Sequence, residues 1–210
     1  MQRGRIIKNL ILIGGGSFAS EVAEVAIQNN FHILGYVDFQ KTGINLKYLG
    51  KYDDLQRSSL PDFSFFPAFG AVDRKGLIRR ASILKEYDVD SIVSLVSPSA
   101  IVSTNVVLGG GVFVAHGVIL NSGAKLGDYA IINSGSVIGH EVEIYDYSIV
   151  SGKVFIGGNV RVGPKTLIGP GSTIMQSVKI GAEVIVSIGS IVARDIPNNK
   201  TSLPALSKII

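Results

Sequence analysis

Cysteine and tryptophan are absent from this sequence, and histidine occurs only three times. The absence of cysteine excludes a disulfide framework, a thiolate nucleophile and a thiolate metal site. No apolar run is long enough to span a bilayer, and the first apolar stretch runs into the glycines Gly14 to Gly16 rather than into a signal-peptide cleavage site. We therefore expect a cytoplasmic protein that does not insert into membranes.

Charged residues are also sparse, at 17% of the 210 residues, and the formal net charge is +4. Lysine and arginine are scattered and form no basic stripe interleaved with aromatic residues, which argues against nucleic acid as a partner. A small positive excess suits a phosphate-bearing small molecule. Hydrophobic residues make up 46% of the chain, which is enough for a full core in one or two domains.

A six-residue repeat occupies the chain from Ile101 to Ile196, in sixteen consecutive hexads. The second residue of every hexad is Val, Leu or Ile, and the sixth is Val, Ala, Ser, Thr or Ile. This period fits neither an α-helix nor a hairpin array, but it is typical of a parallel β-helix built from short stacked strands. Three hexads close one triangular coil, so residues eighteen apart stack, and about five coils are expected.

Positions within the hexad have different expected roles. The third to fifth positions are rich in Gly, Asn, Asp, Ser and Pro, and should form the corners, where a positive φ is often needed. The second positions should point inward, and one such column would contain Val102, Leu120, Ile138, Ile156, Ile174 and Val192.

The residues ahead of the repeat have the pattern of a β-α-β unit with a short continuation. The expected elements are a strand over Asn9–Ile13, a helix over Phe18–Asn29, a strand over Phe31–Val37, a strand over Phe63–Phe69, a helix over Asp73–Tyr87 and a strand over Ile92–Val96. We therefore predict an α/β plus all-β protein, with a small Rossmann-like domain over 1–97 and a β-helix over 98–210.

Gly14, Gly16 and Ala19 meet the dinucleotide fingerprint, and Asp38 stands about twenty residues further on, where an acid that binds ribose is expected. Amides of such a loop, at a helix N-terminus, form an anion site. A full dinucleotide fold needs two such halves, so one nucleotide or nucleotide sugar is favoured over NAD. A tight turn without any ligand is the remaining alternative.

His116 and His140 both occupy the fourth position of a hexad, at a corner that points outward. His140 precedes Glu141, a carboxylate that can orient the imidazole or raise its basicity. The pattern alone also permits a surface histidine beside a solvated glutamate. His116 is not stacked on His140, because twenty-four residues separate them, and its role stays open, including an approach to that site from a neighbouring subunit.

The whole chain resembles the bacterial sugar acetyltransferases of the sialic acid O-acetyltransferase and nucleotide-amino-sugar N-acetyltransferase family. The resemblance rests on the Gly14–Ala19 loop, Gly35–Asp38, Phe69–Gly70, Ser97–Ala100, Ile132–Glu141, Asp195–Pro197 and Pro204–Ala205. It implies that the β-helix is left-handed and forms a homotrimer, with the active site between two subunits.

The resemblance also implies a reaction. His140 would be the general base that takes a proton from the acceptor as it attacks the thioester of acetyl-CoA, Glu141 would support it, and no metal would take part. The favoured acceptor is the amino group of a nucleotide-linked amino sugar, used for surface polysaccharide or glycan synthesis. A hydroxyl group of a sialic-acid-like sugar is the alternative.

The binding residues implied by the resemblance lie in both domains. The nucleotide sugar would contact Gly16, Ser17, Phe18, Asp38 and Gly70, and acetyl-CoA would run along the prism past Ile149, Pro170 and Ile188. The sequence departs from the family pattern at Phe39, where a second acid is common, and at Ala71, where Asn or Asp is common.

Two other classes of protein fit a hexad prism. A metal enzyme of this architecture needs three histidine ligands, and the prism holds only two histidines. A non-catalytic binding module, whose hexads only build shape, would bind no acetyl-CoA.

Overall fold

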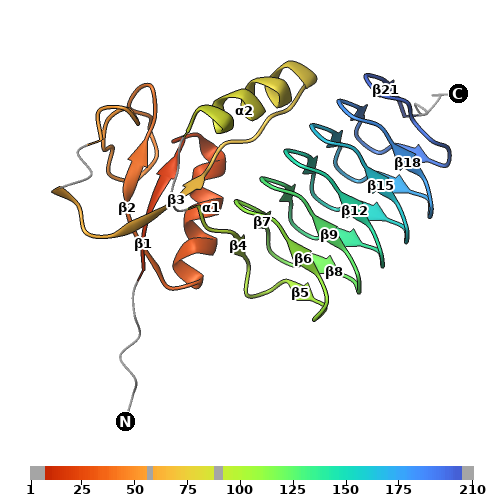
Figure 1. The fold of residues 1–210 in the computed structure, drawn as a ribbon, viewed down its shortest axis with the longest axis horizontal. Coiled ribbons are helices and arrows are strands. Elements are labelled where there is room, and N and C mark those ends of the chain that lie inside the picture. Colours follow the sequence, from red (N-terminus) through yellow and green to blue (C-terminus); the bar gives the residue numbers. More distant parts are fainter. Residues whose placement is uncertain (1–7, 56–58, 88–91, 205–210) are drawn as a thin grey trace, which may run out of the picture.

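The computed structural model describes residues 8–55, 59–87 and 92–204. A small α/β region with a parallel sheet packs along one side of a long parallel β-solenoid (Figure 1). This arrangement confirms the predicted fold class. Ala205, the last residue of the tail motif, lies outside the described residues.

The N-terminal region contains a three-stranded parallel sheet in the order β2-β1-β3. Its elements are β1 (Lys8–Ile13), α1 (Ser17–Gln28), β2 (Phe31–Val37), β3 (Phe63–Pro67) and α2 (Arg74–Glu86). Alanine and valine recur at helical spacing in α1 and bury one face of it. Helix α2 begins after Asp73, whose carboxylate accepts a hydrogen bond of 2.7 Å from the Gly76 amide. Within the described part of the chain, no helix is long and apolar enough to cross a membrane.

The carboxyl ends of the three strands meet at one edge of this sheet, because all the strands are parallel. Gly14 follows β1 with a φ of +102°, which favours glycine, and its amide donates a 2.8 Å hydrogen bond to the carbonyl of Val37. Asp38 follows β2, and its Oδ2 accepts a 2.8 Å hydrogen bond from the Gly15 amide. The glycine loop and Asp38 are therefore fixed to each other.

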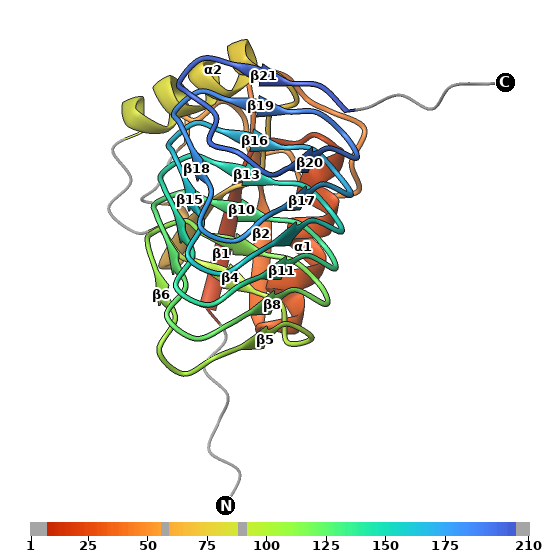
Figure 2. The same cartoon turned by 90° about the vertical axis from the view of Figure 1, so that its right-hand side faces the viewer.

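The solenoid consists of three parallel sheets, with seven, six and five strands. The seven-stranded sheet contains β4 (Leu95–Val96), β7 (Phe113–Val114), β10 (Ile131–Ile132), β13 (Ile149–Val150), β16 (Leu167–Ile168), β19 (Ile185–Val186) and β21 (Thr201–Ser202). The six-stranded sheet, whose strands lie on the right of the solenoid in Figure 2, contains β5 (Ile101–Val102), β8 (Ile119–Leu120), β11 (Val137–Ile138), β14 (Phe155–Ile156), β17 (Thr173–Ile174) and β20 (Ile191–Val192). The five-stranded sheet contains β6 (Val107–Leu108), β9 (Lys125–Leu126), β12 (Glu143–Ile144), β15 (Arg161–Val162) and β18 (Lys179–Ile180).

The expected placement of a strand over Ile92–Val96 in the first domain holds at Ile92 and Val93 and is wrong at Leu95 and Val96. Ile92 forms an isolated bridge with Phe65 of β3, whereas β4 pairs with β7 and is a rung of the solenoid. Strand β21 adds another rung after the last hexad by pairing with β19. The solenoid thus extends beyond the hexads at both ends, because flanking residues still pair with the adjacent coil.

The inner positions form the core as the hexad pattern predicts. The expected inward column is buried at Leu120, Ile138, Ile156, Ile174 and Val192, whereas Val102, near the N-terminal end of the solenoid, is 37% exposed. Buried hydroxyl groups at sixth positions are satisfied by the backbone: Ser136 Oγ donates to the Ser151 carbonyl (2.8 Å) and accepts from the Val154 amide (3.1 Å).

The corners turn through the fifth hexad position, where the backbone adopts a left-handed φ. Glycine occupies several of these positions, but Tyr129 (φ 58°), Glu141 (φ 55°) and Lys153 (φ 56°) adopt the same conformation. The direction of the fourth and fifth side chains at each corner is therefore set by the coil itself. This matters at the corner that carries His140 and Glu141.

The two regions share one hydrophobic core. The Phe18 ring of α1 meets Phe113 of β7 edge-on, with 5.2 Å between ring centroids. Near the C-terminal end of the solenoid, Arg74, at the start of α2, donates through Nε to the carbonyl of Glu183 (2.8 Å). These contacts hold the two helices of the N-terminal region against the solenoid, on the side of its seven-stranded sheet.

Candidate functional site

His140 lies at the corner between β11 and β12, beside a groove of about 970 Å³ that we call the prism groove. The apolar side chains along this groove include Phe155, Met175 and Ile191, which are all exposed. Gln176, also in the groove, is stacked two coils from His140, as the eighteen-residue spacing predicts. The groove offers a long apolar surface next to one imidazole.

The imidazole of His140 lies directly over Gly158, in the next coil. A Cβ atom at Gly158 would overlap His140 Nε2, so only glycine leaves room for the ring in this position. Among the described residues, neither ring nitrogen of His140 has a hydrogen-bond partner. The position of the imidazole is thus set by its contact with Gly158, and its ring nitrogens are available to a substrate.

The Glu141 carboxylate lies on the opposite side of its own coil, over Gly123, where it occupies the space that a Cβ would need. Within the described part of the chain, no hydrogen bond joins Glu141 to His140. The two side chains are adjacent in sequence but extend toward different neighbouring coils, because residue 140 stacks on residue 158 and residue 141 lies over residue 123.

We expect Gly158→Ala to lower kcat/KM for acetyl transfer by about ten- to a hundredfold. The new methyl group would displace the His140 imidazole, and a displacement of about 1 Å is enough to disturb catalysis. Steady-state kinetics with wild-type protein in parallel measures this. The matched control is Gly110→Ala, at the same hexad position of another corner, where the nearest atom to a Cβ is 3.8 Å away. Equal activity of the two variants would contradict a role for the position of the His140 imidazole in the reaction.

Four of the predicted substrate residues gather in a second cavity, of about 460 Å³, which we call the loop cavity. Gly16, Ser17, Phe18 and Gly70 line it from the N-terminal region, and the solenoid contributes Ile131, Asn133, Ile149 and Ser151. Gly16 precedes α1, and no atom lies within 4 Å of a Cβ placed on it. Among the described residues, no group accepts a hydrogen bond from the amides of Ser17 and Phe18, so these two amides remain available to an anion.

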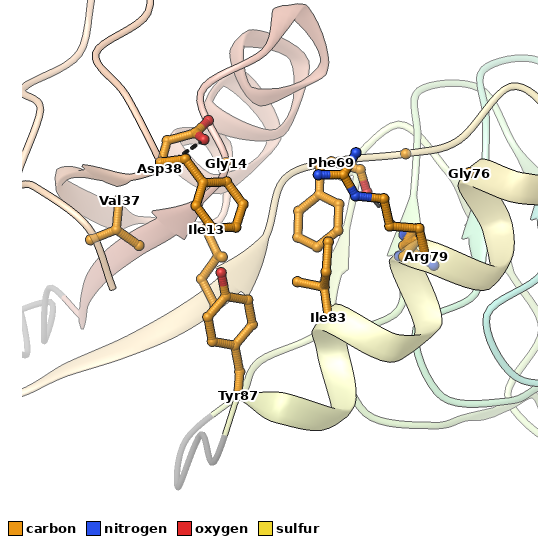
Figure 3. A pocket seen from close by; sticks show the side chains of 12 residues that line it. Ile13, Gly14, Val37, Asp38, Phe69, Gly76, Arg79, Ile83 and Tyr87 are labelled. Atoms are coloured by element: carbon orange, nitrogen blue, oxygen red, sulfur yellow. Dashed lines mark hydrogen bonds between the residues drawn. The ribbon is translucent and has the colours of Figure 1, made fainter. Parts of the chain in front are cut away.

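Asp38 lines a third cavity, of about 310 Å³, at the carboxyl edge of the sheet (Figure 3), which we call the strand-edge cavity. Phe69 and Gly70 line both this cavity and the loop cavity, so the two are neighbours. Tyr87 forms part of its wall, and burial, followed by the nearby Asp38 carboxylate, raises the pKa of its hydroxyl. All five predicted substrate residues thus line two adjoining cavities.

The three predicted cofactor residues do not line the prism groove. Ile149 is buried in β13 and faces the loop cavity. Pro170 and Ile188 stack at the corner that follows the seven-stranded sheet, whereas His140 lies at the corner that follows the six-stranded sheet. Within one chain these three residues and His140 therefore belong to different surfaces.

His116 lies at the same corner column as Pro170. Its Nδ1 is 2.7 Å from Ser97 Oγ and 3.3 Å from Ser99 Oγ, and its Nε2 is 3.9 Å from the Glu24 carboxylate of α1. These contacts join the solenoid to the N-terminal region, which is a structural role that the sequence pattern did not indicate.

Arg80 is a residue that sequence reasoning missed. Its side chain is 2% exposed, and it donates from Nε to the Phe69 carbonyl (2.9 Å) and from Nη1 to the Tyr129 carbonyl (3.0 Å) of the solenoid. Burial lowers its pKa to about 10, with Tyr147 and Tyr129 acting in the opposite direction. The signal was present, because Arg80 lies at helical spacing from the apolar residues Leu77 and Leu84.

The chemistry available at His140 is proton transfer. Among the described residues, no group of three or more His, Cys, Asp or Glu side chains is placed to hold a metal ion. An exposed imidazole beside an apolar groove can take a proton from an attacking nucleophile, and the groove can hold an extended thioester.

A match to the family described as PglD N-terminal domain covers residues 9–80. A comparison with curated proteins finds no match. The family match includes the glycine loop, Asp38 and Gly70, so it spans the two cavities of the N-terminal region.

Solved structures resemble the whole chain. A His-to-Asn variant of perosamine N-acetyltransferase from Caulobacter crescentus, in complex with CoA and GDP-perosamine, is 30% identical with a TM-score of 0.83, and 93% of each chain is covered. PerB from the same organism, also with CoA and GDP-perosamine, is 31% identical (TM-score 0.81; 91% of this chain and 92% of that chain). The acetyltransferase domain of PglB from Neisseria gonorrhoeae, in complex with acetyl coenzyme A, is 25% identical (TM-score 0.82; 93% and 95%).

Proposed function

Because the chain belongs to the nucleotide-amino-sugar N-acetyltransferases of the β-helix family, we propose that its own residues carry out that reaction at the corner formed by His140. The enzyme transfers the acetyl group of acetyl-CoA to the amino group of a nucleotide-linked amino sugar. N-acetylation is favoured over the O-acetylation of a sialic-acid-like sugar, because perosamine N-acetyltransferase matches 93% of the chain at 30% identity. The product serves surface polysaccharide or glycan synthesis.

His140 is the general base of this proposal. The acceptor nitrogen attacks the thioester carbon, His140 takes the proton that this nitrogen loses, the carbon–sulfur bond breaks, and the CoA sulfur leaves and receives a proton. The observation that carries the assignment is an exposed imidazole, fixed over Gly158 and without a partner among the described residues, beside a long apolar groove. No covalent intermediate is needed, because the thioester is already activated.

The prism groove is the proposed path of acetyl-CoA. Its exposed apolar residues, Phe155, Met175 and Ile191, suit the pantetheine arm, and Arg194 lies beside Ile191 at the end of the groove, where a phosphate would meet a cation. The expected contacts with Pro170 and Ile188, at the corner after the seven-stranded sheet, and with Ile149, in the loop cavity, are kept in this proposal only if a second subunit brings these residues to the groove.

Glu141 keeps its proposed supporting role, although its carboxylate extends toward Gly123. In this role the Glu141 carboxylate would either turn toward the His140 imidazole or bind the acceptor sugar next to it. Glu141→Gln keeps the shape and removes the charge, so a lower kcat with unchanged KM supports the role, and unchanged kinetics would remove it.

The nucleotide sugar is proposed to occupy the two adjoining cavities of the N-terminal region. The diphosphate would meet the α1 amides at Gly16, Ser17 and Phe18, and the nucleoside would extend past Gly70 toward Asp38. Residues 1–97 then bind the acceptor, and residues 98–210 bind acetyl-CoA and carry the base. We place the reaction in the cytoplasm, where both substrates are metabolites.

The acceptor cavities and the prism groove share no lining residue, which supports a site built from two subunits of a homotrimer. An apolar stripe runs along the outer face of the six-stranded sheet, with Ile101 64%, Phe155 49% and Ile191 82% exposed. The outer face of the five-stranded sheet instead carries charges, including Lys125, Glu143 and Arg161. The apolar stripe is therefore the proposed subunit contact.

We expect Ile101→Asp to shift the protein from trimer toward monomer at micromolar concentration, because it places a charge in the apolar stripe. Sedimentation velocity measures this. The control is Val107→Asp, which changes an equally outward, 57% exposed residue of the five-stranded sheet and should leave the trimer intact. A monomeric wild-type protein, or equal effects of the two variants, would contradict the proposed contact.

The proposed function is tested by release of the CoA thiol from acetyl-CoA in the presence of UDP-, GDP- and dTDP-linked amino sugars. One of these acceptors should give turnover that depends on both substrates. Absence of turnover with every amino sugar, together with no binding of acetyl-CoA by calorimetry at millimolar ligand, would favour a non-catalytic module.

A further inference from the structure

The strand-edge cavity has the shape and the chemistry of a slot for a planar base. Its walls are mostly apolar and aromatic, with Phe39, Phe69 and Tyr87 among the lining residues. Phe69 is held in place by Arg80, whose Nε donates to its carbonyl and whose guanidinium carbon lies 6.0 Å from its ring centroid. A flat aromatic ligand fits between such walls better than a sugar or a phosphate does.

Two groups of opposite hydrogen-bonding character face this slot. Figure 3 shows Asp38 and Arg79 approaching it from opposite sides, one from the end of β2 and the other from α2. Each Asp38 oxygen accepts one backbone amide, from Gly15 (2.8 Å) and from Phe39 (2.7 Å), and keeps further acceptor capacity. Arg79 is exposed and makes no ion pair or side-chain hydrogen bond with another described residue, so its donors are available.

Guanine is the base whose edges match this pair. Its N1–H and N2–H₂ groups are adjacent donors for a carboxylate, and its O6 and N7 are adjacent acceptors for a guanidinium. Uracil and thymine offer a single N–H between two carbonyl oxygens, so a carboxylate gains one hydrogen bond and faces two acceptors. Adenine has no ring N–H on this edge, because its N1 is an acceptor, and its single amino group offers a carboxylate no adjacent second donor.

We propose that this cavity selects guanine, so that the acceptor is a GDP-linked amino sugar, with Asp38 accepting from N1 and N2 and Arg79 donating to O6 and N7. The inference rests on the proposed function for the sugar, but the recognition of the base stands on the cavity alone. Asp38 and Arg79 are specificity-determining residues in this account, and neither takes part in the chemistry at His140.

The first test varies the ligand and leaves the protein intact. Isothermal titration of the full chain, without acetyl-CoA, compares GDP, UDP, dTDP and inosine diphosphate, which lacks the 2-amino group. GDP is expected to bind at least about tenfold more tightly than each of the others, the scale of one well-formed base contact. Binding of UDP or dTDP as tightly as GDP would overturn the proposal, and so would equal affinity for GDP and inosine diphosphate, since Asp38 would then contact ribose instead.

The second test separates the base from the diphosphate. In wild-type protein, 7-deaza-GDP should bind about tenfold more weakly than GDP, and Arg79→Met should abolish this difference, because N7 has then lost its donor. Arg79→Lys keeps the charge without the paired donors and should restore only part of it. If Arg79→Met instead weakens GDP and UDP by the same factor, Arg79 binds phosphate and the proposal fails. Thermal melting of each variant checks that the fold is intact.

The two proposals fail separately. Preferential GDP binding without acetyl transfer to any GDP-linked amino sugar would refute the proposed reaction and keep the base assignment. Acetylation of a UDP- or dTDP-linked amino sugar, with no preference for GDP, would refute the base assignment and keep the reaction.

Discussion

Replacing His140 with alanine is expected to lower kcat/KM for acetyl transfer by about 10²- to 10⁴-fold, the usual contribution of a positioned general base. The loss should appear mainly in kcat, because the imidazole acts on the proton that leaves during the reaction and binds neither substrate tightly. Steady-state release of the CoA thiol at saturating acceptor measures it. The fold should persist, since His140 is exposed at a corner and has no side-chain partner among the described residues.

The control for this variant is His32→Ala, which removes an exposed histidine of β2 far from the prism groove in sequence and in the fold. Its kinetics should match wild type within a factor of two or so. If His140→Ala keeps most of its activity while its melting temperature is unchanged, His140 is not the base.

The second large effect concerns stability, and Arg80→Met is expected to lower the free energy of unfolding by about 2–3 kcal/mol. The methionine fills the space but leaves the carbonyls of Phe69 and Tyr129 without donors, each at a cost of about 1–3 kcal/mol. Part of this loss is offset, because the wild-type protein buries a charged group whose Nη2 has no partner among the described residues. Thermal melting should show a decrease of about 5–10 °C.

Arg79→Met is the matched control for Arg80→Met, since it removes a neighbouring arginine of the same helix whose side chain is exposed. Its melting temperature should be close to that of wild type. Arg80→Met should also weaken nucleotide binding, because Phe69 lines both acceptor cavities. Equal stability of the two variants would show that the buried guanidinium does not join the two regions.

Much of the fold could be predicted from the sequence, because each group of three hexads corresponds to one coil of the solenoid. An aliphatic residue at the second position of each hexad, such as the buried Ile138, and a turn at every corner leave few alternatives to a stacked prism. The exception is the segment over Ile92–Val96. Its apolar residues suit either region, and only the pairing of Leu95 with Phe113 decides that β4 belongs to the solenoid.

The positions of two candidate site residues were predictable from the sequence, whereas their roles stay proposals. His140 was expected at an outward corner and Asp38 at a strand end, and both lie there. The position of the prism groove was not predictable from the sequence, because the hexad pattern is the same at all three corners of the coil. The corner that adjoins a groove is decided by which side chains lie next to it in the folded protein. Met175 and Phe155 carry no local signal except that they are apolar at outward positions.

Arg79 and Arg80 were missed for a related reason. Both lie on a helix whose amphipathic pattern attracts attention to its apolar face, and neither belongs to a motif. Arg80 shares the helical spacing of the buried Leu77 and Leu84, whereas only its position over the strand ends distinguishes Arg79 from a solvated arginine. The same helix thus supplies one residue that joins the two regions and one that faces the strand-edge cavity.

The most direct test of the account is the bond formed in the product. Wild-type protein, incubated with acetyl-CoA and a GDP-linked amino sugar, should yield an acetyl amide that survives treatment with neutral hydroxylamine, and His140→Ala should yield almost none. An acetyl group that hydroxylamine removes would be an ester on a hydroxyl, and this result, or equal product from His140→Ala, would contradict N-acetylation with His140 as the base.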